Sequence, residues 1–226
     1  MKFHTPVVQT RYTSPLGPII LAASGKGLAG LWFEGQRHLP PELLARAPAA
    51  SCVEGVALPV APGHWAVLAA GGSSRRTATW PSDPEHPILK LAMQQLDDYF
   101  AGRRARFEVP LDLSHGTAFQ QSVWQALLTI AQGDTASYGE VSARIGKPSA
   151  VRAVGAAVGR NPVSIIVPCH RVMGAGGALT GYAGGLDRKA ALLKLEGALG
   201  LDGDYRWLRG KAAQLRLDPA LEEARP

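Results

Sequence analysis

The sequence predicts two domains: an N-terminal α/β (α+β) domain with a small sheet and a mainly α C-terminal domain that contains a helix-turn-helix. Two apolar runs, residues 19–23 and 28–33, flank a Gly-Lys-Gly turn, a pattern typical of a β-hairpin. Over residues 88–100 apolar side chains recur every three or four positions, which indicates an amphipathic helix. From Thr117 onward, short helical segments alternate with glycine-containing turns. These patterns favour a mixed fold followed by a helical one.

The chain divides into an N-terminal domain, a C-terminal domain and a tail, which we place at residues 1–112, 113–198 and 199–226. Residues 11–18 predict a turn that leads into the first apolar run. Residues 37–87 are rich in Ala, Pro, Gly and Ser, and we interpret them as a variable insertion in the N-terminal domain. Within it, a short helix is expected at residues 41–46 and a strand at residues 64–69.

Three short helices are expected in the C-terminal domain. Thr117 is the candidate N-cap of the first. Either Ser137 or Tyr138 opens the second, which runs through Ile145. After a Gly-Lys-Pro turn, Ser149 caps the third, "AVRAVGAAVG". The order of short helix, tight turn and small-residue helix predicts a helix-turn-helix, with a compact helical hairpin of no DNA-binding role as the alternative.

The positive charge is concentrated in one part of the chain. The formal net charge is +6, and residues 100–195 alone hold eleven basic and five acidic side chains, which matches the whole excess. A basic segment favours a polyanionic partner such as nucleic acid. A solvated basic surface is the alternative that charge alone leaves open.

The sequence predicts neither a membrane span nor a secretion signal. No 18 uncharged apolar residues run together, and the first 14 residues lack the apolar core of a signal peptide. The two cysteines, Cys52 and Cys169, are too few for a disulfide framework or a cysteine-based zinc site. We therefore expect a cytoplasmic protein with no membrane partner and no metal, in which Cys52 is an unreactive thiol.

Cys169 stands in an unusual setting, "NPVSIIVPCHRVMG". The apolar residues 163–167 predict a buried strand that ends at the cysteine. A thiol attacks carbon only as the thiolate, so a base or a positive charge is needed, and His170 and Arg171 are candidates. Neighbours in an extended chain point to opposite faces, so either the chain bends after Pro168 or a water joins the thiol to the imidazole. Glu196, in a later helix, is a candidate for orienting the histidine, and a buried structural cysteine is the alternative.

These residues resemble those of a known family. "AVRAVGAAVGRNPVSIIVPCHRV" followed by "LTGYAGGLDRKAALLKLEG" is similar to the O6-alkylguanine-DNA alkyltransferases, also called methylated-DNA–protein-cysteine methyltransferases. The resemblance is dense over residues 117–197 and weaker at "YTSPLGPIILAAS" and "LDDYFAG". It implies a ribonuclease H-like N-terminal domain and a winged-helix-like C-terminal domain.

The resemblance also implies roles for individual residues in the reaction. Cys169 would take the alkyl group in a stable thioether, and His170, through a water, would form an activating relay with Glu196. Tyr138 resembles the tyrosine that donates a hydrogen bond or proton to the departing guanine. Asn161 resembles the asparagine hinge between the recognition helix and the cysteine segment.

A second set of residues is implied to bind the substrate. Tyr182 and the backbone of Ala183 would line the guanine pocket, and the carbonyls of Val172 and Cys169 would hold the guanine amino group. Lys189 is expected to belong to this substrate-binding set.

The implied function is DNA repair. The protein would remove alkyl groups from O6-alkylguanine, and from O4-alkylthymine, in double-stranded DNA bound through the minor groove. It would act once per molecule, as a monomer, without a cofactor or a metal. Because a base inside a duplex cannot reach a buried thiol, it must be flipped out, and Arg152 resembles the arginine that enters the vacated space.

Three rival functions remain open. A non-catalytic relative would bind alkylated DNA and signal to other factors, although such proteins replace the acceptor cysteine, which is present here as Cys169. A helix-turn-helix regulator could use the methylated cysteine as a switch. A Cys-His hydrolase is the third, without an evident oxyanion-stabilising device in the sequence.

Overall fold

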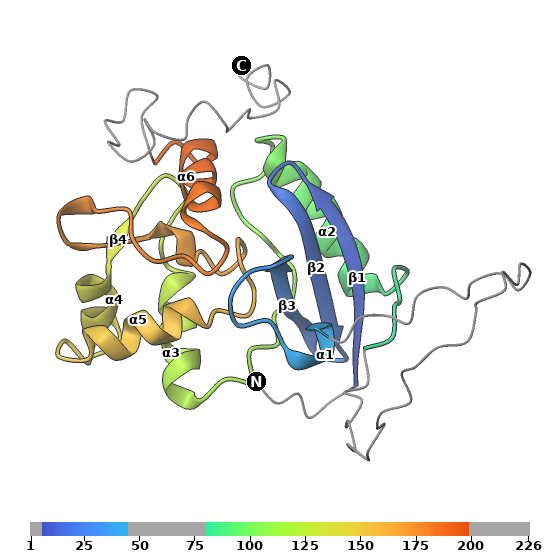
Figure 1. The fold of residues 1–226 in the computed structure, drawn as a ribbon, viewed down its shortest axis with the longest axis horizontal. Helices are drawn as coiled ribbons and strands as arrows, with labels where there is room; N and C mark the ends of the chain where they lie inside the picture. The colour runs from blue at the N-terminus through green and yellow to red at the C-terminus, as the bar shows by residue number, and fades with distance from the viewer. Residues whose placement is uncertain (1–5, 45–79, 199–226) are drawn as a thin grey trace, which may run out of the picture. The chain divides into compact units, whose positions relative to one another are not determined.

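The structure, a computed structural model, describes residues 6–44 and 80–198 (Figure 1). The chain forms two compact units, one of residues Pro40–Trp80 and one of the remainder. The first unit contains helix α1 (Pro41–Leu44), which confirms the start of the helix expected at 41–46. Residues 45 and 46, the strand expected at 64–69 and the tail from residue 199 lie outside the described residues.

A three-stranded antiparallel sheet of order β1-β2-β3 forms the start of the second unit. Its strands are β1 (Val7–Ser14), β2 (Gly17–Ser24) and β3 (Gly27–Phe33). The hairpin expected from the two apolar runs is therefore confirmed. The turn expected at residues 11–18 is confirmed only at Pro15 and Leu16, because Arg11–Ser14 belong to β1 and Gly17 and Pro18 belong to β2. Pairing with a neighbouring strand thus decides the conformation of a segment that is polar and turn-like on its own.

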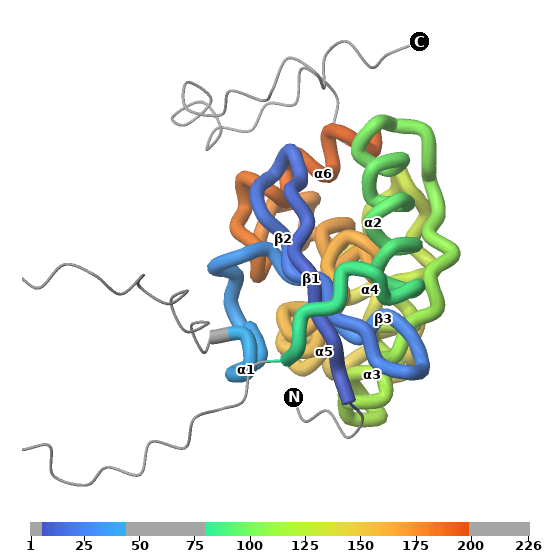
Figure 2. The backbone as a smooth tube through the Cα atoms, turned by 90° about the vertical axis from the view of Figure 1, so that its right-hand side faces the viewer, coloured from blue at the N-terminus to red at the C-terminus, as the bar shows by residue number. Residues whose placement is uncertain are grey.

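Helix α2 (Pro87–Phe100) packs along this sheet, as Figure 2 shows. Proline at the first helical turn starts it, because a proline there loses no intrahelical hydrogen bond. Leu89, Ala92, Leu96 and Tyr99 are buried against the sheet. The helix expected over residues 88–100 is confirmed, although one of its apolar side chains, Leu91, is exposed.

Helices α3 (Ala118–Leu127), α4 (Tyr138–Arg144) and α5 (Val151–Gly159) pack against one another. Thr117 and Ser137 cap α3 and α4 through complete capping boxes, as their sequences predict. The prediction for Ser149 is wrong: the N-cap of α5 is Ala150, which makes no side-chain hydrogen bond. The backbone of Ala150 instead continues the turn by donating to the Lys147 carbonyl at 2.9 Å.

The remaining elements are short apart from one helix. Strands β4 (Ala136–Ser137) and β5 (Val172–Met173) pair in parallel, and helix α6 (Leu186–Leu195) closes the described part of the chain. The β4–β5 pair sets the start of α4 beside the segment that follows Cys169, so it fixes where Tyr138 lies.

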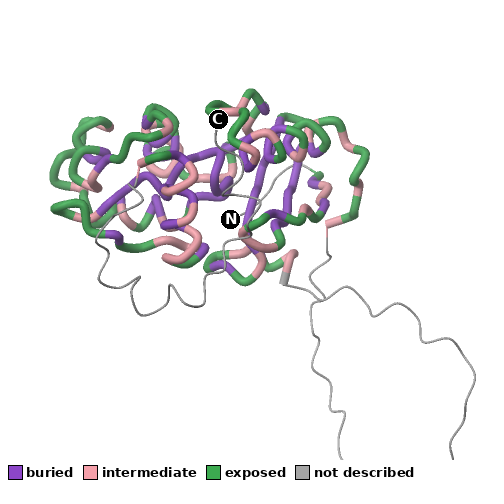
Figure 3. Tube along the Cα trace, turned by 90° about the horizontal axis from the view of Figure 1, so that it is seen from above, coloured by how far each residue is buried: buried purple, intermediate pink, exposed green. Residues whose placement is uncertain are grey.

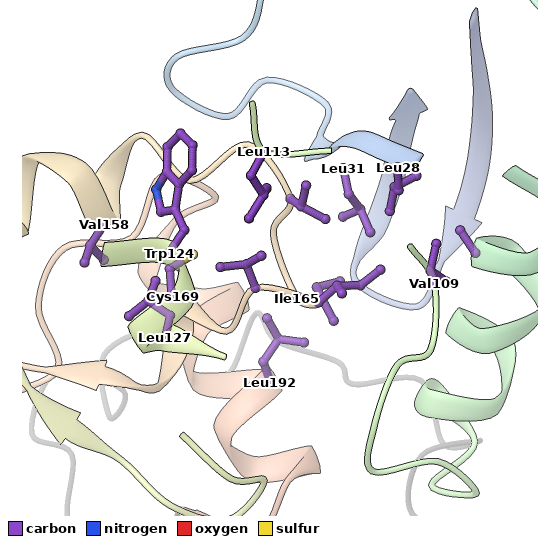
Figure 4. Packing of buried hydrophobic residues seen from close by; sticks show 14 of the residues in the cluster. Leu28, Leu31, Val109, Leu113, Trp124, Leu127, Val158, Ile165, Cys169 and Leu192 are labelled. Carbon is purple, nitrogen blue, oxygen red and sulfur yellow. The ribbon is translucent and has the colours of Figure 1, made fainter. Parts of the chain in front are cut away.

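One hydrophobic core joins the sheet to the helices. Figure 4 shows Leu28 and Leu31 from β3 in the same cluster as Leu127 of α3 and Val158 of α5. Every residue of β3 is buried, and Figure 3 shows the buried segments of the sheet. At the edge of β3, Leu31 exchanges backbone hydrogen bonds of 2.9 Å with Pro162 and Ser164. The N-terminal sheet therefore supports the cysteine-bearing segment directly. No helix in the described ranges has the length and apolar character needed to cross a membrane.

Candidate active site

The segment before the cysteine is a buried turn, so the predicted strand at residues 163–167 is wrong. Asn161 decides this conformation: its Oδ1 accepts from the Val163 N–H at 3.1 Å and its Nδ2 donates to the Val167 carbonyl at 2.7 Å. Ile165 has a φ of 69°, which a strand does not allow. The residues are buried as their composition predicts, and Val163 forms an isolated bridge with Leu31 of β3, but the asparagine amide closes the rest of the segment into a turn.

After Pro168 the chain bends into a 3₁₀ turn, Cys169–Arg171. The bend is one of the two arrangements that the adjacency of cysteine and histidine allowed. Asn161 Nδ2 lies 2.9 Å from Cys169 Sγ and donates to it. Burial raises the pKa of the Cys169 thiol to about 11, and the Asn161 hydrogen bond opposes that shift. At neutral pH the resting thiol is therefore protonated, and a base must take its proton as it reacts.

The His170 side chain is fully buried, and its Nε2 forms a hydrogen bond with Glu196 Oε1 at 2.9 Å. Because an ionised carboxylate only accepts, we assign the ring proton to Nε2. Nδ1 is then an acceptor, and it has no hydrogen-bond partner within the described chain. Burial lowers the pKa of His170 although Glu196 acts to raise it, so the resting imidazole is neutral and can take a proton.

Glu196 lies at the centre of the buried polar cluster. Arg171 donates two hydrogen bonds to this carboxylate, from Nε to Oε2 at 2.7 Å and from Nη2 to Oε1 at 2.8 Å. The Tyr99 hydroxyl donates to Oε1 at 2.7 Å. Although burial alone would raise it, the hydrogen bonds from Arg171 and His170 lower the pKa of Glu196 to about 2. The sequence makes Arg171 a candidate source of positive charge for the thiol, but in the structure its guanidinium binds Glu196 and the Ile130 carbonyl.

A small pocket of about 120 Å³ lies at the junction of α4, α5 and the loop before α6. It is lined by Arg37, His38, Tyr138, Gly155, Gly159, Gly181, Tyr182 and Ala183. Cys169 is not among these lining residues, although an ionised Cys169 would add to the raised pKa of Tyr138 and Tyr182, which both line the pocket. Burial, the larger cause, also raises the pKa of each tyrosine, and both remain protonated donors at neutral pH.

Three of the predicted site residues occupy positions that sequence alone does not show. Lys189 is fully buried, and its Nζ donates to the carbonyls of Val172 and Thr180, the latter at 2.7 Å. It thereby ties the segment after Cys169 to the loop that leads to Tyr182. The Ala183 carbonyl accepts from the Arg37 backbone N–H at 3.1 Å. Arg152, by contrast, is exposed in the first turn of α5, where it makes no hydrogen bond or ion pair with any described residue.

Residues that sequence reasoning missed come from the N-terminal half of the chain. Tyr99 reaches Glu196 from α2, and Arg37 and His38 line the pocket from the segment after β3. The only sequence signal for Tyr99 was its place in "LDDYFAG", and nothing marked Arg37 or His38. Within the described ranges, no group of three or more His, Cys, Asp or Glu residues could hold a metal ion.

Family models and individual relatives both place similar proteins in one family. Two models of 6-O-methylguanine DNA methyltransferase match: its ribonuclease-like domain over residues 7–113 and its DNA-binding domain over residues 118–198. The methylated-DNA–protein-cysteine methyltransferase of Mycobacterium leprae is 44% identical over 183 residues, 81% of this chain and 88% of that protein. That of Methanosarcina acetivorans is 54% identical over 120 residues, 53% of this chain and 75% of that protein.

Solved structures agree with the sequence comparisons. Mycobacterium tuberculosis OGT in complex with DNA matches with a TM-score of 0.61 and 42% identity, covering 83% of this chain and 91% of that one. Mycobacterium tuberculosis O6-methylguanine methyltransferase matches with a TM-score of 0.63 and 42% identity, covering 87% of this chain and 96% of that one. The resemblance drawn from the sequence is confirmed, together with the architecture of a ribonuclease-like domain followed by a DNA-binding domain. The chain belongs to the 6-O-methylguanine DNA methyltransferase family.

Proposed function

We propose that this protein repairs alkylated DNA by transferring the alkyl group from O6 of guanine, and from O4 of thymine, to Sγ of Cys169. The observation that carries the proposal is a buried cysteine held by Asn161, next to a neutral histidine whose Nδ1 is free to accept a proton. The methylated-DNA–protein-cysteine methyltransferases named above share the family. Since a thioether is stable, each molecule acts once. A nucleophilic thiol persists in a reducing compartment, which fits the expected cytoplasmic location.

The reaction is an in-line displacement in which the S–C bond forms as the C–O6 bond breaks. The thiol proton passes through a water to His170 Nδ1, and Glu196 stabilises the imidazolium that results. Guanine leaves as an anion that accepts a hydrogen bond and then a proton from the Tyr138 hydroxyl, and the proton that His170 took from the thiol restores Tyr138 through water. The sum is alkylguanine plus thiol giving guanine plus thioether, so no cofactor or metal takes part.

The small pocket beside Tyr138 holds the flipped base. Tyr182 and the Ala183 backbone line it. The carbonyls of Val172 and Cys169 accept from the guanine amino group, each with one lone pair already used by Lys189 or by the Val172 N–H. Lys189 therefore does not contact the base but holds the Val172 carbonyl in the position where it accepts from the guanine amino group.

DNA binds through a helix-turn-helix made of α4 and α5, within a winged-helix-like domain. Small residues on α5, among them Gly155 and Ala156, let the helix approach the minor groove closely, and Arg152 stands at its N-terminal turn. The protein acts as a monomer, because one chain carries both the DNA-binding helix and the thiol.

Intact mass tests the chemistry. Incubation with a duplex oligonucleotide that carries one O6-methylguanine is expected to add the mass of one methyl group in place of a hydrogen, and peptide mapping should assign it to "IIVPCHR". Cys169→Ala should gain nothing, whereas Cys52→Ala should react as the unaltered protein does. Methylation of Cys52, more than one turnover per molecule, or an unmodified protein that still binds the DNA would each overturn the proposal.

Duplex binding is expected to weaken steeply with salt. The basic excess of the chain lies in residues 100–195, which include the proposed DNA-binding helices. Each phosphate contact should contribute about −0.9 to the slope of log affinity against log salt concentration. Fluorescence anisotropy with an undamaged duplex between low and physiological salt measures the slope. An affinity that does not change with salt would contradict an electrostatic DNA interface.

A further inference from the structure

The hydroxyl of Tyr99 belongs to the buried cluster around Glu196 although it comes from the other domain. Tyr99 lies in the last turn of α2 and is 1% exposed. Its ring contacts the rings of Phe100 and Phe107, each with centroids 5.3 Å apart, so packing holds it in place. From there its hydroxyl donates to Glu196 Oε1 at 2.7 Å, across 97 residues of sequence. The packing fixes the ring and thereby the position from which the hydroxyl donates to the Glu196 carboxylate.

Glu196 Oε1 accepts from three donors at once. Tyr99 and Arg171 lie at 2.7 and 2.8 Å, and His170 Nε2 is the most distant at 2.9 Å. A carboxylate oxygen has two in-plane lone pairs, so three donors compete for its charge. Burial, and then the charge of Glu196, raise the pKa of Tyr99 well above its usual value, so it stays a neutral donor. The hydrogen bond from Tyr99 therefore weakens the hydrogen bond that Glu196 Oε1 accepts from His170 Nε2.

Several other groups act on the His170 ring and on Glu196. The positive charges of Arg171 and Lys189 add to burial in lowering the pKa of His170. Tyr182 interacts electrostatically with both Glu196 and the Cys169 thiol. Lys189 is held by carbonyls. Arg171 shares Oε1 with Tyr99 through Nη2, but it is also held by Glu196 Oε2 and the Ile130 carbonyl, which the Tyr99 hydroxyl does not touch. Removing only that hydroxyl therefore changes one interaction of Glu196 and leaves the neighbouring charges in place.

We propose that Tyr99 is a positioning residue of the alkyl-acceptor site, whose hydroxyl fixes Glu196 Oε1 and limits how strongly that oxygen holds a proton on His170. The N-terminal domain thereby sets the basicity of the relay in the other domain. This inference rests on the proposed function, because the relay matters only if Cys169 transfers an alkyl group.

Tyr99→Phe is expected to move the pH profile of transfer. Without the competing donor, Glu196 stabilises the imidazolium more, so the pKa of His170 rises and the acid limb of the rate moves to higher pH by about 0.5 to 1 unit. The rate is measured with free O6-benzylguanine, which removes DNA binding from the observation. The plateau rate at high pH should stay within about threefold of the unaltered protein, since the base and the thiol remain.

Tyr12→Phe is the matched control. The Tyr12 hydroxyl also donates to a carboxylate at 2.7 Å, that of Asp97 on the same helix, but at an exposed position. Its removal should leave the midpoint of the profile unchanged. Placing 3-fluorotyrosine at position 99 strengthens the donor and keeps the packing, so it should shift the midpoint to lower pH.

The ¹⁵N chemical shifts of the His170 ring give a readout that does not need transfer. They should report a higher pKa in Tyr99→Phe and a proton on Nε2 in the unaltered protein. An unaltered protein that does not transfer would overturn the proposed function, whereas normal transfer with an unmoved midpoint and an unmoved His170 pKa would overturn the role of Tyr99 alone. A lower plateau rate with the midpoint unchanged would likewise reduce Tyr99 to a packing residue.

Discussion

Glu196→Gln is expected to slow alkyl transfer to Cys169 by about 100-fold or more. The substitution keeps the size of the side chain but removes the charge that stabilises the imidazolium of His170, and general acid–base contributions of this kind are worth about 10²- to 10⁴-fold. Single-turnover transfer from free O6-benzylguanine measures the loss. His170→Ala should show a similar loss, and the double variant should be little worse than either, because the two residues act as one unit. Fully additive losses would show that they act separately.

The same substitution is expected to destabilise the fold by about 3 to 5 kcal/mol, because it leaves the buried guanidinium of Arg171 without its carboxylate. The effect should depend on pH in a defined direction. The folded pKa of Glu196, about 2, lies below its ordinary 4.5, so the carboxylate stabilises the fold fully above pH 4.5 and loses that effect as the pH falls toward 2. Urea unfolding should therefore show the largest difference between the two proteins at neutral pH and a shrinking one in acid.

Glu108→Gln controls for the loss of one carboxylate. Its side chain is 80% exposed, beside Arg104 at 3.6 Å, so its removal should change stability by less than about 0.5 kcal/mol. If Glu196→Gln were as stable as this control at neutral pH, the buried Arg171–Glu196 ion pair would not stabilise the fold as expected.

Arg152→Ala is expected to impair repair of duplex DNA strongly and reaction with free O6-benzylguanine hardly at all. Arg152 is exposed in the first turn of α5 and, among the described residues, makes no hydrogen bond or ion pair with Cys169, His170 or Glu196. Its planar guanidinium can stack on bases and donate five hydrogen bonds, which suits it to hold the space of a flipped base. Flipping a paired base costs a few kcal/mol, so losing part of that compensation lowers the rate even at saturating DNA.

Lys147→Ala is the matched control for the Arg152 experiment. It removes an exposed cation from the turn before α5, and its loss should weaken duplex binding while the rate at saturating DNA stays unchanged. Single-stranded substrate should be affected only in part by Arg152→Ala, because less pairing has to be broken. Equal losses on the free base and the duplex would mean that Arg152 supports the fold or the pocket, and a loss confined to affinity would reduce it to a phosphate contact.

Sequence reasoning succeeded where the signal is local. The hairpin of β2 and β3 and the helices α3 and α4 follow from turn residues, periodicity and the candidate caps Thr117 and Ser137, each within a few positions of chain. It failed at Ser149, where a plausible cap stands one residue before the actual N-cap, Ala150. It also failed over residues 163–167, where an apolar run predicts a strand but the Asn161 side chain closes a turn.

By itself the sequence determined the family, the proposal of Cys169 as the alkyl acceptor, and the helices and strands whose signals lie within a single turn or period. Only the tertiary structure decided what surrounds that cysteine. Tyr99 meets Glu196 from 97 residues away, and Arg37 reaches the pocket from the N-terminal half. Such partners carry no local pattern, because a hydrogen bond depends on where two side chains lie in space, and their positions follow from the packing of the whole core.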